Sequence, residues 1–353
     1  MWGVNPTVTF HVGDVLEVLR SMPDQSVHSV ITSPPYWRKR AYLPASHPDA
    51  ERELGQENTP GEFLASLLAI TDELWRIVRD DGTIWINLGD TASESGGAGG
   101  DYAEGGMRQG QNKYGGSATA GGGLAQNGKR RSSARQPAGD RTQRPLAKSV
   151  CWIPELFGAS LAYGRNLLTG EPCRQWITRP PVTWCKPAPT PGEIIDKFRE
   201  ATELFVWAAK EPRYYFDLDA VRQPQKSMDE RHEGRSGGRE GWPSKMAYTE
   251  RALNPKGAPP LNWWKISTSG YNGAHFATFP PELIYRPVIV SCPEGGTILD
   301  PFGGSGTTAM VAIGNNRSAI LIDIDERNVG LAQDRLGLFV PEVVHHSAAE
   351  VVA

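Results

Sequence analysis

The chain has 353 residues, with 37 Lys and Arg against 40 Asp and Glu, and therefore a formal net charge of -3 at pH 7. This length accommodates one large α/β domain with insertions or two ordinary domains, and we expect a single enlarged domain. The acidic total excludes a uniformly basic surface, so any nucleic-acid-binding surface has to be local.

No segment approaches the roughly 20 apolar residues of a membrane helix, and the first residues lack a basic stretch followed by an apolar run. We therefore expect a soluble cytoplasmic protein, from a bacterial, archaeal or phage-infected cell, with no membrane partner. The four cysteines are widely spaced and form no Cys-x-x-Cys pair, which predicts reduced thiols and neither a metal site nor a disulfide framework.

Strands and helices alternate over the first 90 residues. Apolar and polar residues alternate over 8–12, and the apolar spacing over 15–19 is helical, so this stretch predicts a strand followed by a helix. The β-branched run 27–32 predicts a second strand, which must end at Ser33-Pro34-Pro35-Tyr36 because two prolines forbid its continuation.

The next pair of elements carries clear boundary signals. Thr59-Pro60-Gly61-Glu62 matches a capping box with proline in the first turn, and apolar residues recur at helical spacing to Ile77. Asp81-Gly82 is expected to break the chain before a buried strand over 83–88. Such alternation favours a parallel sheet, and we assign residues 1–92 to the first half of the domain.

Residues 93–149 are rich in glycine, serine, glutamine and arginine and cannot bury enough apolar surface to pack independently. We interpret them as a mobile insertion, either a solvated linker or a contact to the DNA backbone. The cations of its second half include Lys129, Arg130 and Arg131.

The domain resumes over residues 150–222. A strand is expected at 182–186, a helix-like stretch near 193–199 and a buried strand over 204–209. Residues 223–274 are again irregular, and their cations, including Lys245 and Lys256, are interleaved with five Trp and Tyr residues. This composition suits contact with a polyanion that has stackable bases, or a surface loop pinned by buried aromatics.

Residues 275–340 carry the clearest unit, a βαβα pattern with strands at 297–300 and 318–323 and helices at about 307–313 and 326–336. Residues 341–353 are expected to form a tail. Between the first strand and helix lies a turn whose glycines allow close backbone approach to a ligand, and Asp323 stands where an acid can bond ribose hydroxyls. The turn lacks both the Walker spacing and Gly-x-Gly-x-x-Gly, which favours a nucleoside cofactor without pyrophosphate.

Asp-Pro-Phe-Gly-Gly-Ser-Gly-Thr-Thr at 300–308 resembles the S-adenosylmethionine motif of DNA amino-methyltransferases, and Thr-Ser-Pro-Pro-Tyr-Trp at 32–37 resembles their catalytic motif. Because the catalytic motif comes first, the chain resembles the circularly permuted β class of that family. His275-Phe-Ala-Thr-Phe-Pro280 matches the remaining cofactor-pocket segment. The likeness covers about 8–90, 176–222 and 275–336, and implies a Rossmann-like α/β fold with a mostly parallel seven-stranded sheet, a reversed final strand and irregular insertions.

The resemblance implies a set of site residues. The catalytic candidates are Ser33, Pro34, Pro35 and Tyr36. The candidates for binding S-adenosylmethionine are Asp14, Phe279, Asp300, Pro301, Phe302, Gly303, Gly304, Ser305, Gly306, Thr307 and Asp323. Asp14 also has the position of a helix cap, and Asp325 has the position of an N-cap rather than of a ligand. The DNA-binding candidates are Arg38, Arg40, Lys129, Arg130, Arg131, Lys245 and Lys256.

These residue types suit methylation of an exocyclic amine. Ser33 Oγ and the Pro34 carbonyl would accept the hydrogens of the amine, while Tyr36 would stack on a base extruded from the duplex. Serine at the first motif position resembles the cytosine-N4 enzymes more than the adenine-N6 enzymes, which are the alternative. A C5-cytosine enzyme is disfavoured because its required cysteine nucleophile would be Cys173, which lies in a turn.

A non-catalytic DNA-binding protein is the hypothesis from another class, and it would tolerate damage to motifs that are intact here. The motif order favours DNA over RNA or a protein amide as the substrate. The expected partners are double-stranded DNA and a cognate restriction endonuclease, and the expected state is a monomer or a homodimer. The target sequence is not readable from the chain.

Overall fold

The computed structural model describes residues 5–44, 46–93, 102–103, 107–108, 145–146, 149–188, 197–224, 254–268 and 279–346. In the first half the elements are β1 (Val8–Val12), α1 (Val15–Ser21), β2 (Val27–Thr32), the 3-10 turn η1 (Ala50–Arg52), α2 (Pro60–Ile77), β3 (Val78–Leu88), β4 (Tyr102–Ala103), β5 (Met107–Arg108) and α3 (Ile153–Tyr163). The second half contains β6 (Ile177–Thr178), β7 (Val182–Cys185), β8 (Thr202–Ala209), η3 (Asp219–Val221), β9 (Trp263–Lys265), α6 (Pro281–Ser291), β10 (Thr297–Asp300), α7 (Thr307–Ile313), β11 (Ser318–Asp323), α8 (Arg327–Leu336) and β12 (Glu342–His345).

One mixed sheet organises the molecule, in the order β12-β1-β11-β10-β2-β3-β8-β7-β9, with β6 also paired to β8. All neighbours from β12 to β3 are parallel, whereas β8 runs antiparallel to both β3 and β7. The expected Rossmann-like, mostly parallel sheet is confirmed. Among the described residues this sheet has ten strands rather than seven, because the short strands β6, β9 and β12 extend it.

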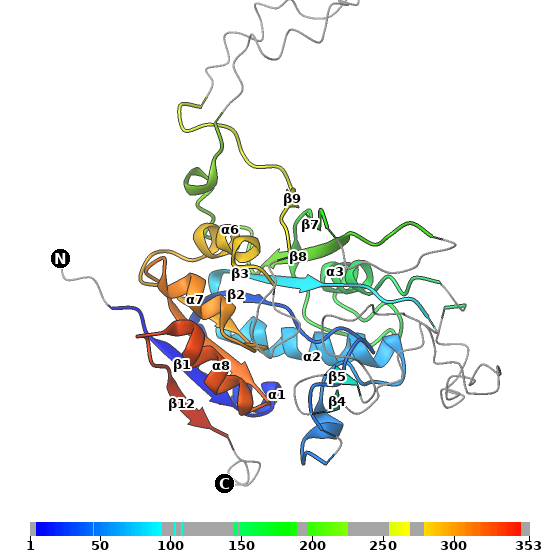
Figure 1. The fold of residues 1–353 in the computed structure, drawn as a ribbon. Coiled ribbons are helices and arrows are strands. Elements are labelled where there is room, and N and C mark those ends of the chain that lie inside the picture. The colour runs from blue at the N-terminus through cyan, green and yellow to red at the C-terminus, as the bar shows by residue number, and fades with distance from the viewer. Residues whose placement is uncertain are drawn as a thin grey trace, which may run out of the picture.

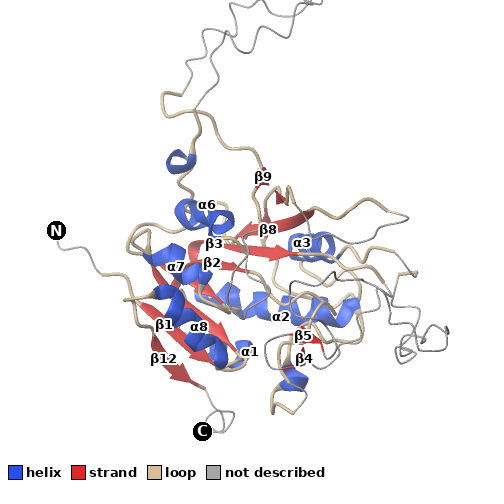
Figure 2. Ribbon diagram, viewed as in Figure 1, coloured by secondary structure: helices blue, strands red, loops and turns tan. Residues whose placement is uncertain are grey.

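Helices cover both faces of the sheet (Figures 1 and 2). On one face, α1, α2 and α3 contribute buried side chains such as Leu19, Phe63 and Phe157 to one apolar core. On the other face, α6, α7 and α8 contribute Leu283, Ala312 and Ala332 to a second core. The alternating strand and helix pattern therefore produces three layers, as parallel connections require.

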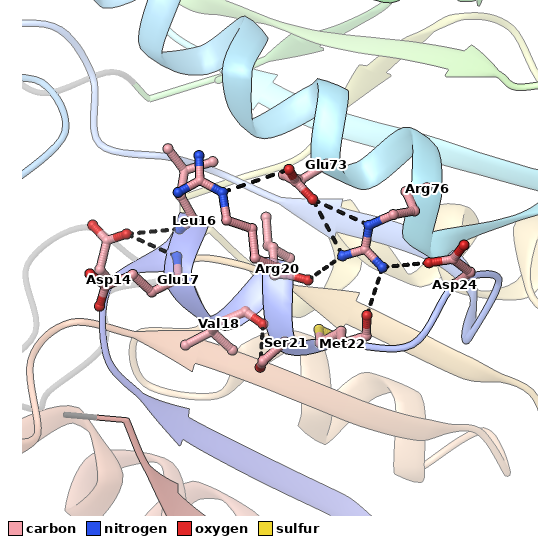
Figure 3. Close-up of polar contacts among 11 residues, drawn as sticks. Asp14, Leu16, Glu17, Val18, Arg20, Ser21, Met22, Asp24, Glu73 and Arg76 are labelled. Carbon is pink, nitrogen blue, oxygen red and sulfur yellow. Dashed lines mark hydrogen bonds and ion pairs between the residues drawn. The ribbon is translucent and has the colours of Figure 1, made fainter. Parts of the chain in front are cut away.

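The first helices are fixed by the signals visible in the sequence. Thr59 and Glu62 form the expected capping box at the start of α2. Arg76 near the end of α2 donates to the carbonyls of Leu19 and Met22 at distances of 2.7 Å, and it also bonds Glu73 and Asp24 (Figure 3). The Leu19 carbonyl also accepts from the backbone N–H of Met22, so Arg76 adds to the cap at the end of α1 and locks α1 against α2.

Three expectations about local structure were wrong. Asp81-Gly82 does not break the chain, since β3 runs through it and the pairing with β2 shifts register between Val27 and Ser29. Residues 342–345, expected in a tail, form an edge strand that pairs in parallel with β1. Residues 197–199 are not helical, and the rest of the expected helix-like stretch lies outside the described residues.

The insertion expected at 93–149 lies mostly outside the described residues, as does most of 223–274. In the parts of the chain that the structure describes, β4 pairs with β5 and β9 pairs with β7. No helix among the described residues is both long and apolar enough to span a bilayer.

The two motifs of interest come together through the sheet order. β10 pairs in parallel with β2, so the loop that follows Asp300 and the motif that begins at Ser33 leave the same edge of the sheet side by side. Ligands bind at this edge in open α/β sheets. The permuted chain order thus brings segments about 270 residues apart into one place.

Candidate active site

A pocket of about 930 Å³, including its solvent-open mouth, lies at the carboxyl ends of β1, β2, β10 and β11. Its lining comes from these strand ends, the glycine-rich turn, the segment before α6 and the loop between β2 and α2. The lining residues are Gly13, Asp14, Val15, Ser33, Pro35, Tyr42, Arg52, Glu53, Leu54, Phe279, Asp300, Pro301, Phe302, Gly303, Gly304, Ser305, Asp323, Ile324, Asp325 and Asn328.

The glycines of the turn are required by its packing. A Cβ at Gly303 would lie 2.8 Å from the Cβ of Leu321, which no side chain could accept without displacement of β11. Gly306 has φ of +76°, and a Cβ there would lie 3.0 Å from the Cβ of Ala332 in α8. The turn therefore presses against β11 and α8, and its other side is left as a floor of the pocket.

Asp323 stands at the end of β11 beside this turn. Its two carboxylate oxygens accept hydrogen bonds from the backbone N–H groups of Asp325 (2.9 Å) and Gly304 (2.8 Å). Burial raises the pKa of this carboxyl to about 6, and the backbone hydrogen bonds oppose that rise. The carboxylate is thus held rigidly at the pocket wall with lone pairs left for a ligand.

Asp14 caps α1, whereas the N-cap of α8 is Glu326 and not Asp325. Asp14 is the N-cap of α1 and accepts from the backbone N–H groups of Leu16 (3.0 Å) and Glu17 (3.1 Å), so the capping interpretation is confirmed. The Asp325 carboxylate accepts from the backbone N–H of Arg327, although α8 itself begins after Glu326. Both side chains also belong to the pocket lining, and these hydrogen bonds therefore leave a role in ligand binding open to each.

Asp300 connects the glycine-rich turn to the motif at the end of β2. Its carboxylate accepts from the hydroxyls of Thr32 and Thr308, each at 2.5 Å, and from the backbone N–H of Phe302 at 3.1 Å. The side chain is only 1% exposed, and burial raises its pKa to about 6. Because Thr32 directly precedes Ser33, this carboxyl fixes the spacing between the two motifs.

The four residues of the Ser33–Tyr36 motif do not all face the pocket. Ser33 and Pro35 line it, together with Phe279 and the glycine-rich turn. Pro34 is buried behind them, and Tyr36 is partly buried next to Gly89, where a Cβ would lie 2.4 Å from the Tyr36 ring. Gly306 and Thr307 also lie outside the lining, and Thr307 Oγ1 accepts a hydrogen bond from Arg335.

A polar cluster around the Tyr36 hydroxyl was missed by the sequence analysis. The hydroxyl donates to Glu203 Oε2 at 2.8 Å and accepts from Asn87 Nδ2 at 2.8 Å, while Lys186 forms an ion pair with Glu203. Burial, then the charge of Glu203, raises the pKa of the Tyr36 phenol well above its usual range. The available signal was positional, since Asn87, Lys186 and Glu203 each lie at, or one residue from, an end of an expected strand.

The wall formed by Tyr42, Arg52, Glu53 and Leu54 was also missed. Glu53 is buried and accepts from the backbone N–H groups of Tyr42 (2.5 Å) and Leu43 (3.1 Å), which folds the loop between β2 and α2 over the pocket. Arg52 pairs with Glu17 and lies 3.7 Å from Asp14. Irregular loops carry no periodicity, so the sequence held no signal for this wall.

Three of the DNA-binding candidates, Arg38, Arg40 and Lys256, belong to the described residues, and none of these three lines the pocket. Arg38 donates to the carbonyl of Glu57 and lies over the Trp37 ring, while one buried guanidinium nitrogen of Arg40 has no hydrogen-bond partner among the described residues. Lys256 pairs with Asp219 at 2.8 Å. Lys129, Arg130, Arg131 and Lys245 lie outside the described residues.

The pocket fits a nucleoside-bearing methyl donor. Ser305 Oγ, on the glycine-rich turn, is buried with no hydrogen-bond partner in the described part of the chain, so it is available to a polar group of a ligand in the pocket. Asp323 offers a carboxylate suited to vicinal hydroxyls, and Phe279 and Phe302 offer apolar surface. Together with the sheet order, these features define a methyltransferase-type α/β enzyme.

Comparison with known proteins gives the family. Residues 27–334 match the profile of the DNA methylase family, N6_N4_Mtase, and the chain belongs to this family. It is a DNA methyltransferase of the N4-cytosine/N6-adenine family, and its methyl donor is S-adenosylmethionine.

Similar proteins include two curated bacterial enzymes. The chain is 30% identical to type II methyltransferase M.XycI of Xanthomonas campestris pv. cyanopsidis and 29% identical to M.Cfr9I of Citrobacter freundii. Each alignment covers 93% of this chain and 87% of the relative.

Two solved structures share the fold. The cytosine-N4-specific PvuII DNA methyltransferase matches with a TM-score of 0.56 and 16% identity, over 95% of this chain and 90% of its own. A putative DNA modification methylase from Thermus thermophilus, in complex with S-adenosyl-L-methionine, matches with a TM-score of 0.51 and 22% identity, over 97% and 99%.

Proposed function

We propose that this enzyme transfers the methyl group of S-adenosylmethionine to the exocyclic N4 of cytosine in double-stranded DNA, with the target base flipped out of the helix. The observation that carries the proposal is the shared pocket in which Ser33 faces the glycine-rich turn, with Thr32 and Asp300 holding the two together. Serine at the first motif position favours cytosine, and adenine N6 is the alternative product.

The cofactor supplies an electrophilic methyl carbon on a sulfonium, and the chain would hold it through the turn at 300–306. Asp323 would bond its ribose hydroxyls, Asp14 would lie near its adenine amine, and Phe279 and Phe302 would enclose its apolar parts. Ser305 Oγ and the N–H groups of the turn would meet its polar end. Each of these residues except the turn's last glycine lines the pocket.

The chain's own residues would prepare the amine. The lone pair of the cytosine amine is delocalised into the ring, so acceptors set against its hydrogens favour a more tetrahedral and nucleophilic nitrogen. Ser33 Oγ, in the pocket lining, and the carbonyl of Pro34, the second residue after the end of β2, would act as these acceptors. The two prolines restrict the backbone and keep the acceptors oriented for in-line attack, so positioning would supply most of the acceleration.

Cytosine C5 methylation finds no support at Cys173. Its thiol lies against the carbonyl of Ser160 behind α3, and burial raises its pKa to about 11. A nucleophilic cysteine needs a lowered pKa and access to the substrate. A non-catalytic DNA-binding role is disfavoured because both motifs are intact and converge on one pocket.

The decisive experiment is product analysis. Bacterial genomic DNA amplified in vitro, and therefore unmethylated, is incubated with the enzyme and S-adenosylmethionine, digested to nucleosides and separated by mass spectrometry. We expect N4-methylcytosine. N6-methyladenine as the sole product would overturn the choice of base, and absence of any methylated nucleoside, with no thermal stabilisation by the cofactor, would overturn the proposed function. Sequencing the modified DNA would also identify the target site and guide a search for a cognate endonuclease.

The role assigned to Asp323 predicts a pH dependence of cofactor binding. Ribose hydroxyls donate to the ionised carboxylate, whose pKa is raised to about 6 in the free protein. Protonation should therefore oppose binding, and the dissociation constant should rise by up to about tenfold per pH unit below pH 6. Isothermal titration calorimetry between pH 5 and 8 measures this.

The matched variant is Asp323→Asn, which carries no titrating carboxyl at this position. We expect weaker binding with a much flatter pH profile, whereas Asp24→Asn, which changes a mostly exposed partner of Arg76 outside the pocket lining, should retain the wild-type profile. A profile in Asp323→Asn as steep as that of the wild type would show that another group controls the pH dependence.

A further inference from the structure

The cluster at Tyr36 gives the hydrogen bonds of Ser33 a direction. The Tyr36 phenol keeps its proton, because burial and the nearby Glu203 charge raise its pKa. That single hydrogen is directed to Glu203 Oε2 at 2.8 Å. The phenolic oxygen can then only accept, and it does so from Asn87 Nδ2 and from Ser33 Oγ.

The carboxylate of Glu203 is held in place by neighbouring polar side chains. Its other carboxylate oxygen pairs with Lys186, whose ammonium also lies 4.4 Å from the centre of the Trp184 ring. Asn87 Nδ2 donates a second hydrogen bond to Glu203 Oε2 at 3.0 Å. The side chain of Glu203 is 14% exposed, so the ion pair is shielded from bulk water. A carboxylate paired in this way offers Tyr36 only acceptor atoms.

The consequence reaches the pocket through Ser33. A serine hydroxyl has one hydrogen and two lone pairs, and here the hydrogen points to Tyr36, at the long Oγ–Oη distance of 3.5 Å. What Ser33 presents to the pocket is therefore an acceptor. An amino group can donate to it, whereas the carbonyl oxygen at the same position of a thymine or uracil cannot.

We propose that Glu203 is a positioning residue that, through Tyr36, fixes Ser33 as a hydrogen-bond acceptor and so selects an amino group as the methyl acceptor. This inference rests on the proposed function, in which Ser33 contacts the target amine. Lys186 and Asn87 support it by holding the carboxylate in place. No proton is transferred along the chain, because only the directions of its hydrogen bonds matter.

The test compares Glu203→Gln, Tyr36→Phe and the double variant. Steady-state methylation of in vitro amplified genomic DNA should show kcat lowered about 10- to 100-fold in Glu203→Gln, with the cofactor dissociation constant unchanged within about twofold. The single amide oxygen of glutamine is expected to face Lys186, which leaves an N–H group, and no acceptor, towards the Tyr36 hydroxyl. Because both changes then disrupt the same link, Glu203→Gln should cost less than about twofold when added to Tyr36→Phe.

Spectroscopy supplies a readout other than turnover. With ¹³C-labelled tyrosine, the Tyr36 Cζ resonance is identified by its loss in Tyr36→Phe, and it should shift in Glu203→Gln. The matched control is Glu73→Gln, which removes a carboxylate on α2 that pairs with Arg76 of α2 and Arg20 of α1 (Figure 3). It should leave the resonance and kcat as in the wild type.

Two outcomes would overturn the inference. One is an unchanged kcat in Glu203→Gln. The other is a loss of kcat that is as large when Glu203→Gln is added to Tyr36→Phe as when it is made in the wild type. If Glu203→Gln fails to fold, Tyr36→Phe still removes the hydroxyl that connects Glu203 to Ser33, and it leaves the ion pair of Glu203 with Lys186 intact. An unchanged kcat in Tyr36→Phe would overturn the inference as well. Failure of the proposed function is distinguishable, because it appears in the methylated product of the wild-type enzyme and not in the comparison of variants.

Discussion

Replacing Ser33 by alanine should lower kcat by roughly 100-fold or more while leaving the cofactor dissociation constant within about twofold of the wild type. The reason is geometric. Ser33 Oγ lies in the pocket beside the glycine-rich turn and would accept a hydrogen of the target amine, an interaction that matters most as the nitrogen becomes tetrahedral. Single-turnover methylation of in vitro amplified genomic DNA, with calorimetry for the cofactor, separates the two effects.

Ser21→Ala is the matched control. Its hydroxyl donates to the Val18 carbonyl within α1, and Ser21 ends that helix outside the pocket lining, so turnover should stay as in the wild type. Parallel losses of turnover and cofactor affinity in Ser33→Ala would contradict a transition-state role. They would instead indicate that the serine shapes the cofactor pocket.

The parts of this site that could be predicted are those with strong local signals. Prolines after a β-branched strand located the end of β2, and the glycine-rich turn between an apolar strand and a helix located the other motif. Both predicted strand ends were confirmed, and the parallel pairing of β2 with β10 brings them together. Local pattern and sheet topology were sufficient for this much.

The parts of the site that could not be predicted depend on contacts between residues distant in sequence. Glu203 reaches Tyr36 across 167 positions, and Asp300 reaches Thr32 across 268. The apolar periodicity of the sequence does not predict these contacts of Glu203 and Asp300. An acidic residue beside an apolar run is equally typical of an ordinary strand end. The continuity of β3 through Asp81-Gly82 was missed for a related reason, since a shift in strand register absorbs residues that usually end a strand.

Replacing Asp300 by alanine should destabilise the fold by roughly 3–5 kcal/mol at neutral pH. Three donors, the hydroxyls of Thr32 and Thr308 and the backbone N–H of Phe302, would lose their acceptor at a site that is almost fully buried. Urea unfolding measures the change. Asp24→Ala is the control, because its carboxylate is a mostly exposed partner of Arg76 and its loss should cost about 1 kcal/mol or less (Figure 3).

The same residue predicts the direction of a pH effect on stability. Burial raises the pKa of Asp300 to about 6 in the folded protein, above its value in the unfolded chain, so the folded state binds the proton more tightly. The associated stability is fully present below about pH 4 and is lost as the pH rises through 6. Relative to Asp300→Asn, which does not titrate, the wild type should therefore lose unfolding free energy between pH 5 and 7.5. A constant difference between the two proteins over that range would mean that the carboxyl ionises with the same pKa in both states.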